Sequence, residues 1–179
     1  MIGVLVSGEG TNLQALIDAD LPVVAVASNK PNARALDRAA AAEIPSRAFP
    51  LDAYASRHRR DEEMASWLTL RGVDLVVLAG YMHLLTPQFL ERFPDRIVNV
   101  HPSLLPAFPG AHAIEDALAA GVDTTGVTVH YVDEGLDTGT VIRQETLPLE
   151  PRETLAERIH AVEHRILPEV VRELCSAVH

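Results

Sequence analysis

The sequence predicts a doubly wound α/β fold on a mostly parallel sheet, with an antiparallel strand pair added late in the chain. Short runs that are apolar throughout alternate with helical stretches over residues 2–100. Such runs are typical of parallel strands covered by helices on both faces. Residues 124–149 instead alternate, lack helical spacing and contain a turn rich in Gly and Asp, which indicates two antiparallel strands.

The first hundred residues supply the elements of the parallel part. Apolar runs rich in β-branched residues favour strands, expected at residues 2–6, 22–28, 74–80 and 96–100. Helical spacing or alanine-rich composition favours helices, expected at residues 11–19, 32–43, 52–72 and 86–93. Gly72 suits a helix C-terminus and Pro87 a first turn. A long amphipathic helix is expected at residues 152–174, with a kink at Pro168.

The composition fits one globular domain spanning residues 1–179. Lys and Arg number 15 against 25 Asp and Glu, and the resulting net charge of −10 argues against a nucleic-acid partner. No apolar stretch reaches the ~20 residues of a membrane-spanning helix, and the N-terminus lacks a basic leader. The one cysteine, Cys175, suits a reducing compartment. We therefore expect a cytoplasmic protein with no membrane or nucleic-acid partner.

The glycine-rich loop after the first strand is a candidate phosphate site. Two glycines let the backbone approach a ligand, and the first N–H groups of the next helix favour an anion. Leu13 stands where the dinucleotide pattern GxGxxG needs a third glycine, so a monophosphate is favoured. The alternative is a tight turn with Thr11 as the helix N-cap. Glu9 is expected to point to solvent, because a carboxylate repels phosphate. The candidate residues are Gly8, Glu9, Gly10, Thr11 and Asn12.

A second candidate site lies at the end of the strand at residues 96–100, in the stretch VNVHPSLLPAFPG. Asn99 and His101 are two residues apart in extended chain, so their side chains share one face. An amide and an imidazolium on one face can donate to one developing oxyanion, as acyl transfer requires. The prolines that follow stiffen the exit, and a cis bond is expected at Leu105–Pro106. The alternative is that both side chains satisfy the loop's own backbone groups.

A carboxylate beside the histidine would strengthen this site. The turn VDEGLDTGTVI holds Asp133, Glu134 and Asp137, and Asp137 is flanked by Leu136 rather than by another charge. A nearby carboxylate favours the imidazolium form of a histidine. The alternative is that Asp137 forms an ordinary Asx-turn. His130 and His164 are expected to be structural or surface residues.

Four stretches resemble the phosphoribosylglycinamide formyltransferases, folate-dependent enzymes of purine synthesis. They are VSGEGTNLQALID, VVLAGYMHLL, IVNVHPSLLPAFPG and GVTVHYVDEGLDTGTVI. HPSLLP and LDTG are shared with the wider formyltransferase superfamily, whereas SGxGTNLQ is more specific. The resemblance runs from residue 2 to about residue 171. It implies a Rossmann-like formyltransferase fold that moves a formyl group from 10-formyltetrahydrofolate to the amine of 5-phosphoribosylglycinamide.

The resemblance also implies which residues act. The catalytic trio would be Asn99, His101 and Asp137. The ribonucleotide would be bound by Gly8, Glu9, Gly10, Thr11, Asn12, His160 and Glu163. The folate would be bound by Arg57, Met82, His83, Leu84, Leu85, Asn99, Asp133, Glu134, Gly135, Leu136 and Asp137. Two residues depart from the family pattern: His83 stands where many relatives carry arginine, and Glu9 replaces a smaller or neutral residue.

The rival functions differ from formyl transfer to the ribonucleotide in the acceptor of the formyl group or in the additional domains that they need. A 10-formyltetrahydrofolate hydrolase is the main alternative, with water as acceptor, and it would normally carry an N-terminal regulatory domain. A methionyl-tRNA formyltransferase would need a further C-terminal domain and a basic surface, and a binding module without catalysis would not need the trio. No HExxH or CxxC spacing occurs, so no metal is expected. We expect a monomer or homodimer that acts on small-molecule substrates.

Overall fold

The computed structural model describes residues 1–177, which form two compact units divided within one strand. The first unit is Met1–Val98 and the second begins at Asn99. Strand β5 (Ile97–His101) contains the division and therefore contributes to both. Residues 178–179 lie outside the described residues. The single domain expected over residues 1–179 stays a prediction.

The first unit contains the predicted parallel sheet. Its strands are β1 (Ile2–Val6), β2 (Val23–Ser28), β3 (Ser46–Ala48) and β4 (Leu75–Leu78). Their order is β3-β2-β1-β4, with β5 next to β4. β1 pairs in parallel with β2 and β4, and β2 pairs in parallel with β3. Every residue of β1 and β4 is buried, as expected for strands covered on both faces.

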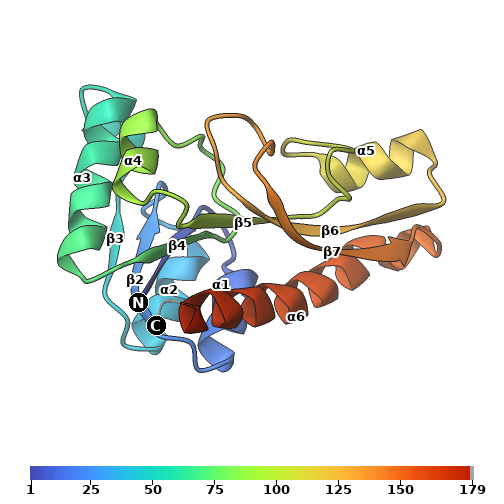
Figure 1. The fold of residues 1–179 in the computed structure, drawn as a ribbon, viewed down its shortest axis with the longest axis horizontal. Coiled ribbons are helices and arrows are strands. Elements are labelled where there is room, and N and C mark those ends of the chain that lie inside the picture. The colour runs from blue at the N-terminus through green and yellow to red at the C-terminus, as the bar shows by residue number, and fades with distance from the viewer. Residues whose placement is uncertain (178–179) are drawn as a thin grey trace. The chain divides into compact units, whose positions relative to one another are not determined.

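Four helices accompany these strands in two pairs. They are α1 (Thr11–Asp18), α2 (Arg34–Ala41), α3 (Arg57–Leu70) and α4 (Pro87–Arg92). α1 contacts α2, and α3 contacts α4 (Figure 1). The chain moves outward from β1 to β3 and then returns to β4, so right-handed crossovers put the two pairs on opposite faces. This is the doubly wound arrangement that the sequence predicts.

One local expectation for the first unit is wrong, and one strand of this unit was not predicted. The helix expected at 52–72 begins only at Arg57, because the Ser56 hydroxyl caps it by accepting a hydrogen bond from the Arg59 N–H at 3.2 Å. A separate 3₁₀ turn covers Leu51–Ala53. Strand β3 was not expected at all, since its three residues are too few for a periodic signal. Gly72 follows the helix in the left-handed conformation, as a C-terminal glycine should.

The second unit contains the predicted antiparallel pair. β6 (Thr124–Tyr131) pairs with β7 (Val141–Pro148), with Thr124 opposite Pro148 at one end. β5 lies next to β6 in the strand order. A helix that the sequence reading missed, α5 (Ala113–Ala120), comes between β5 and β6 along the chain. The predicted mostly parallel sheet with a late antiparallel pair is thus confirmed.

The last helix covers one face of β6 and β7 (Figure 1). α6 (Leu155–Ser176) follows a 3₁₀ turn at Arg152–Thr154 and continues through Pro168. Its buried residues are Leu155, Ile159, Glu163, Ile166, Leu167, Pro168, Val170 and Val171. Glu163 is therefore a buried acid within the apolar stripe, whereas its neighbour Val162 is only half-buried.

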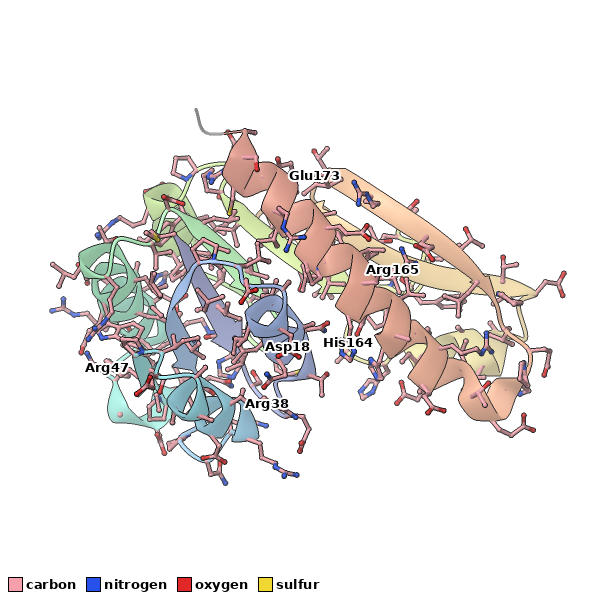
Figure 2. All side chains as sticks on the ribbon, turned by 90° about the horizontal axis from the view of Figure 1, so that it is seen from below. Asp18, Arg38, Arg47, His164, Arg165 and Glu173 are labelled. Carbon is pink, nitrogen blue, oxygen red and sulfur yellow. The ribbon has the colours of Figure 1, made fainter. Side chains whose placement is uncertain are left out.

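The outer side of α6 is joined to β7 by charge pairs. Arg143 on β7 donates to Glu169 at 3.1 Å and to Glu173 at 2.7 Å. Arg165 pairs with Glu145, two residues further along β7 than Arg143, and Figure 2 labels Arg165 and Glu173 on the helix. Among residues 1–177, no helix is long and apolar enough to cross a membrane.

Candidate functional site

Strand β5 carries Asn99 and His101 at its carboxyl end. Val98 and Val100 are buried on the alternate positions, so the two polar side chains share a face as predicted. His101 is only 4% exposed. Its Nδ1 lies 3.5 Å from Oδ2 of Asp137. The histidine and the carboxylate predicted from distant parts of the sequence are therefore neighbours.

The other ring nitrogen of His101 is also engaged. Nε2 lies 2.8 Å from the carbonyl oxygen of Phe108, and a carbonyl can only accept, so Nε2 carries a proton. The Ser103 hydroxyl donates to the carbonyl of Ala107 at 2.5 Å and lies 3.4 Å from that of Phe108. Both ring nitrogens of His101 therefore face acceptor oxygens.

The proline-rich loop after β5 is fixed by polar side chains. The expected cis bond at Leu105–Pro106 is present, as is a second one at Glu150–Pro151. The Leu105 N–H donates to Oγ1 of Thr128 at 3.2 Å, and Nε2 of Gln144 donates to the Leu105 carbonyl at 2.8 Å. Thr128 also donates to the Ser103 carbonyl at 2.7 Å. Side chains of β6 and β7 thus add to the stiffness that the prolines supply.

Two aspartates in the turn between β6 and β7 make different hydrogen bonds. Oδ1 of Asp133 accepts from the Gly135 N–H at 2.9 Å, so the Asx-turn considered for Asp137 is formed by Asp133 instead. Asp137 accepts from the Gly110 N–H at 2.8 Å and has a φ of 54°. At Gly139 a Cβ would come within 1.7 Å of the Tyr131 carbonyl oxygen, so only glycine fits there. The turn thereby holds Asp137 against the proline loop.

A cavity of about 330 Å³ adjoins Asp137. Its lining is mostly apolar and consists of Leu105, Pro106, Pro109, Leu136, Asp137, Thr138, Gly139 and Val141. Leu136 and Val141 are exposed, at 51% and 44%. Apolar walls beside one carboxylate suit a flat ring with a few polar edges.

The glycine loop of the first unit brings the backbone before α1 close to helix α2. Gly10, not Thr11, is the N-cap of α1, with a φ of 77° and no side-chain cap, so the alternative of a turn capped by Thr11 is not what the structure shows. A Cβ at Gly10 would lie 2.6 Å from Cβ of Ala35 on α2. Glu9 is exposed as expected and lies 3.4 Å from Nη1 of Arg34. Its carbonyl accepts from Nε of Arg38 at 2.7 Å, and Figure 2 labels Arg38 on α2.

The segment 82–85 is held from both sides by polar groups. Ser7 accepts from the Met82 N–H at 2.9 Å and donates to Oδ1 of Asn29 at 2.6 Å. The His83 ring lies 3.3 Å from Nδ2 of Asn29 and 3.1 Å from Nη1 of Arg60. Burial, followed by the charge of Arg60, lowers the pKa of His83. His83 is therefore favoured in its neutral form.

The support beneath this segment is a buried ion pair that sequence reasoning missed. Arg60 and Asp61 are both fully buried, with Nε of Arg60 2.6 Å from Oδ1 of Asp61. Oδ2 of Asp61 accepts from the Thr86 N–H at 2.9 Å. The stretch SRHRRDEE gave no signal, because mixed charges on a helix usually mark a solvated face. Arg57, the member of this stretch that the resemblance assigns to the folate, is exposed.

Glu163 on α6 has the partner that its burial requires. Nδ1 of His160 lies 2.9 Å from Oε2 of Glu163, one helical turn away. That hydrogen bond raises the pKa of His160. The rings of His160 and His164 are stacked, with centroids 6.4 Å apart.

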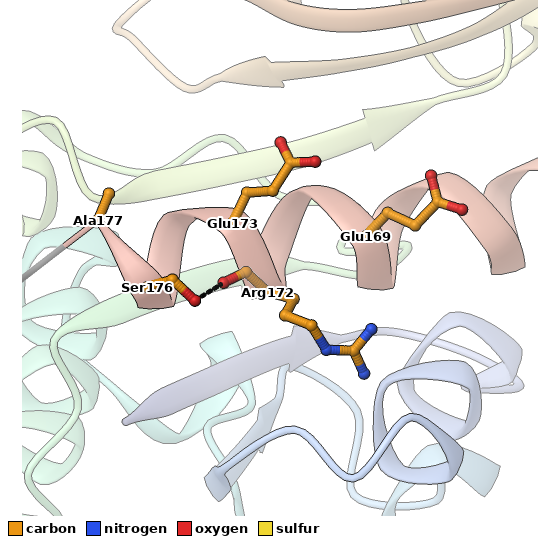
Figure 3. A pocket seen from close by; sticks show the side chains of 5 residues that line it. All are labelled: Glu169, Arg172, Glu173, Ser176 and Ala177. Atoms are coloured by element: carbon orange, nitrogen blue, oxygen red, sulfur yellow. Dashed lines mark hydrogen bonds between the residues drawn. The ribbon is translucent and has the colours of Figure 1, made fainter.

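A pocket of about 520 Å³ at the end of α6 holds none of the predicted site residues. It is lined by Glu169, Arg172, Glu173, Ser176 and Ala177 (Figure 3). Within it the Ser176 hydroxyl donates to the Arg172 carbonyl at 3.0 Å. Exposed charges on one helix face do not form a functional site by themselves.

Two polar residues of β6 complete the site around β5. Thr128 is fully buried and His130 is 2% exposed. Nε2 of His130 lies 3.3 Å from Nδ2 of Asn99 and 3.7 Å from Oδ1 of Asp137. The sequence contains a pattern that could have identified Thr128 and His130, because they stand two residues apart in a strand, as Asn99 and His101 do. Of the two possibilities expected for His130, a structural or a surface residue, its burial excludes the surface position.

Comparisons with known proteins agree with the resemblance. Residues 1–171 match the family model described as formyl transferase. A phosphoribosylglycinamide formyltransferase of Mycobacterium tuberculosis is 45% identical, covering 97% of this chain and 84% of that protein. The crystal structure of glycinamide ribonucleotide transformylase 1 from Symbiobacterium toebii superposes with a TM-score of 0.95 and 45% identity, over 98% of this chain and 87% of that one.

Other relatives are much longer than this chain. The trifunctional purine biosynthetic protein adenosine-3 of Drosophila pseudoobscura is 44% identical over 98% of this chain. The chain spans only 14% of the length of that protein. The match therefore concerns one part of a larger polypeptide.

Proposed function

The chain belongs to the formyl transferase family, and from this premise we propose that it transfers a formyl group from 10-formyltetrahydrofolate to the amine of 5-phosphoribosylglycinamide. The observation that carries the proposal is the grouping of Asn99, His101 and Asp137, with a 3.5 Å contact between the last two. Relatives named for this activity cover nearly the whole chain. The reaction would serve purine biosynthesis.

The trio suits direct attack on the formyl carbon. The amine nitrogen forms a bond to that carbon, the bond from the carbon to folate N10 breaks, and a proton passes from the amine to N10. In between, the formyl oxygen carries negative charge. N–H groups of Asn99 and of a protonated His101 would stabilise that charge, and Asp137 would balance the imidazolium. Losing one such donor typically costs ~10²–10³ in rate.

The loop after β5 must change its conformation for His101 to donate a hydrogen bond to the formyl oxygen. Nδ1 faces Asp137, and the Nε2–H is taken by the Phe108 carbonyl at 2.8 Å. The substrate oxygen can receive the Nε2–H only if it displaces that carbonyl. We therefore expect binding of the formyl donor to move Phe108.

The folate would use the cavity beside Asp137 and the segment 82–85. Leu136 and Val141 offer exposed apolar surface in the cavity, and Met82 and Leu84 offer it in the segment, at 59% and 50% exposed. Backbone groups of the turn Asp133–Asp137 would bind the polar edges of the ring, and Arg57 would lie near the folate tail. No metal takes part in the proposed reaction.

The ribonucleotide would use the glycine loop and α6. The N–H groups that open α1 after Gly8–Gly10 suit its phosphate, because they lack intrahelical partners. His160 and Glu163 form a hydrogen-bonded pair that could receive its polar groups. We propose that the enzyme works in the cytoplasm, in keeping with its one cysteine, as a monomer or homodimer.

One assay tests the proposal. The protein is mixed with 10-formyltetrahydrofolate, with and without the ribonucleotide, and loss of the formyl group is followed. We expect turnover only when the ribonucleotide is present. Turnover without it would assign the protein as a hydrolase, and no turnover in either mixture would refute the proposal.

A further inference from the structure

His130 is buried against two members of the trio and has no place in the reaction proposed above. It lies on β6 and is 2% exposed. Its Nδ1 lies 2.8 Å from the carbonyl oxygen of Tyr131. Its Nε2 faces the amide of Asn99 at 3.3 Å and the carboxylate of Asp137 at 3.7 Å. A buried imidazole with both nitrogens next to polar groups has a defined protonation state.

The Tyr131 carbonyl fixes which nitrogen of His130 carries the proton. A carbonyl only accepts, so at 2.8 Å the Nδ1 must be the donor. In the neutral ring Nε2 is then an acceptor. Burial lowers the pKa of His130, and this outweighs the contacts with Tyr131 and Asp137 that raise it, so the neutral ring is favoured.

An acceptor at Nε2 decides which end of the Asn99 amide faces it. If the amide oxygen of Asn99 faced Nε2 of His130, a lone pair of the oxygen would meet the lone pair of the nitrogen. With the NH₂ group facing Nε2, the two residues form a hydrogen bond at 3.3 Å. The two ends of an asparagine amide are almost the same size, so packing alone barely distinguishes them. The hydrogen bond to His130 therefore selects one of two orientations related by a half turn.

We propose that His130 is a positioning residue, which holds the Asn99 amide by accepting one of its N–H bonds and so leaves the second N–H directed at the oxyanion. The proposal rests on the function proposed above, because it needs Asn99 to donate in the reaction. Without His130 the amide can turn its oxygen toward the negative charge. An acceptor in that place repels the oxyanion instead of stabilising it.

Three single variants and one double variant separate this role from a structural one. His130→Met removes the acceptor at similar volume, and kcat is expected to fall about 10- to 100-fold with KM nearly unchanged, because only the transition-state charge is affected. In His130→Gln the side-chain oxygen can replace Nε2 as acceptor, so most of the activity should return. In Asn99→Ala the amide is absent, so adding His130→Met should cost nothing further.

The double variant provides the decisive comparison. If the losses from His130→Met and Asn99→Ala multiply, His130 does not act through Asn99 and the proposal is overturned. A His130→Met enzyme with wild-type kcat overturns it as well. Absence of turnover in the wild type refutes the proposed function itself. Turnover in the wild type with multiplying losses refutes only the positioning role.

A spectroscopic readout needs neither activity nor a variant. Nitrogen-15 NMR of the imidazoles at neutral pH should show His130 protonated at Nδ1 and unprotonated at Nε2. Its Nε2 should also be coupled through the hydrogen bond to the side-chain amide of Asn99. In the variants, the Asn99 amide resonances should shift in His130→Met and remain in place in His58→Met, which alters an exposed histidine of the other unit. A proton on Nε2 of His130 would overturn the proposal.

Discussion

Replacing Asp61 with asparagine tests what holds residues 81–86 in place. Both Arg60 and Asp61 are 0% exposed, so the variant would leave a guanidinium in the interior without a counter-charge. Removing one partner of a buried ion pair costs about 3–5 kcal/mol. A typical domain is stable by only about 5–15 kcal/mol. Asp61→Asn should therefore remove a large part of the free energy of unfolding.

The hydrogen bonds of Asp61 explain why asparagine is a poor substitute. One carboxylate oxygen accepts from Nε of Arg60 at 2.6 Å, and the other accepts from the Thr86 N–H at 2.9 Å. An amide has one oxygen and one NH₂, so one of these two donors would face another donor. The loss thus combines an unpaired charge with either a lost charge-assisted hydrogen bond or an unsatisfied backbone N–H.

Urea and thermal unfolding followed by circular dichroism would measure the effect. In a chain of this length 1 kcal/mol shifts Tm by about 2–4 °C, so Asp61→Asn should lower Tm by roughly 6–20 °C. Glu62→Gln is the matched control, because Glu62 is exposed and pairs with Arg59 at 3.2 Å on the surface. That variant should stay within about 1 kcal/mol of the wild type. An Asp61→Asn protein as stable as the control would refute the reasoning.

Three further variants test other parts of the molecule. His101→Ala should unfold like the wild type yet lose at least ~10²-fold in formyl transfer, and a wild-type rate would exclude His101 from the reaction. Gly10→Ala should lower stability by about 1 kcal/mol or more, because its Cβ would meet Ala35 at 2.6 Å and its φ is 77°; an unchanged urea midpoint would contradict this. The pKa of folded His160 is raised by Glu163, so the stability from this pair is present below the ordinary value of 6.5 and is lost as pH rises through the folded pKa. In Glu163→Gln the free energy of unfolding, measured across this pH range, should no longer show this loss. A loss as large as in the wild type would show that the pH dependence of stability has another origin.

The fold was largely predictable because its strands carry their signal locally. Each buried parallel strand must be apolar on both faces, so runs such as residues 2–6 and 75–78 are visible without any partner. Strand β3 is defined only by its pairing with β2, and its three residues give no pattern of their own. The start of α3 was misplaced because the capping hydrogen bond of Ser56 depends on backbone geometry.

The sequence by itself determined that Asn99 and His101 share a face, because alternation along a strand is a local property. It also determined the glycine loop and the apolar stripe of α6. Only the tertiary structure decided which groups surround the imidazoles: Asp137 beside His101, the Phe108 carbonyl on its Nε2, and His130 against Asn99. The physical reason is that a proton's position on a ring follows from the donors and acceptors around it. Those groups come from residues far apart in the chain, so no local pattern records them.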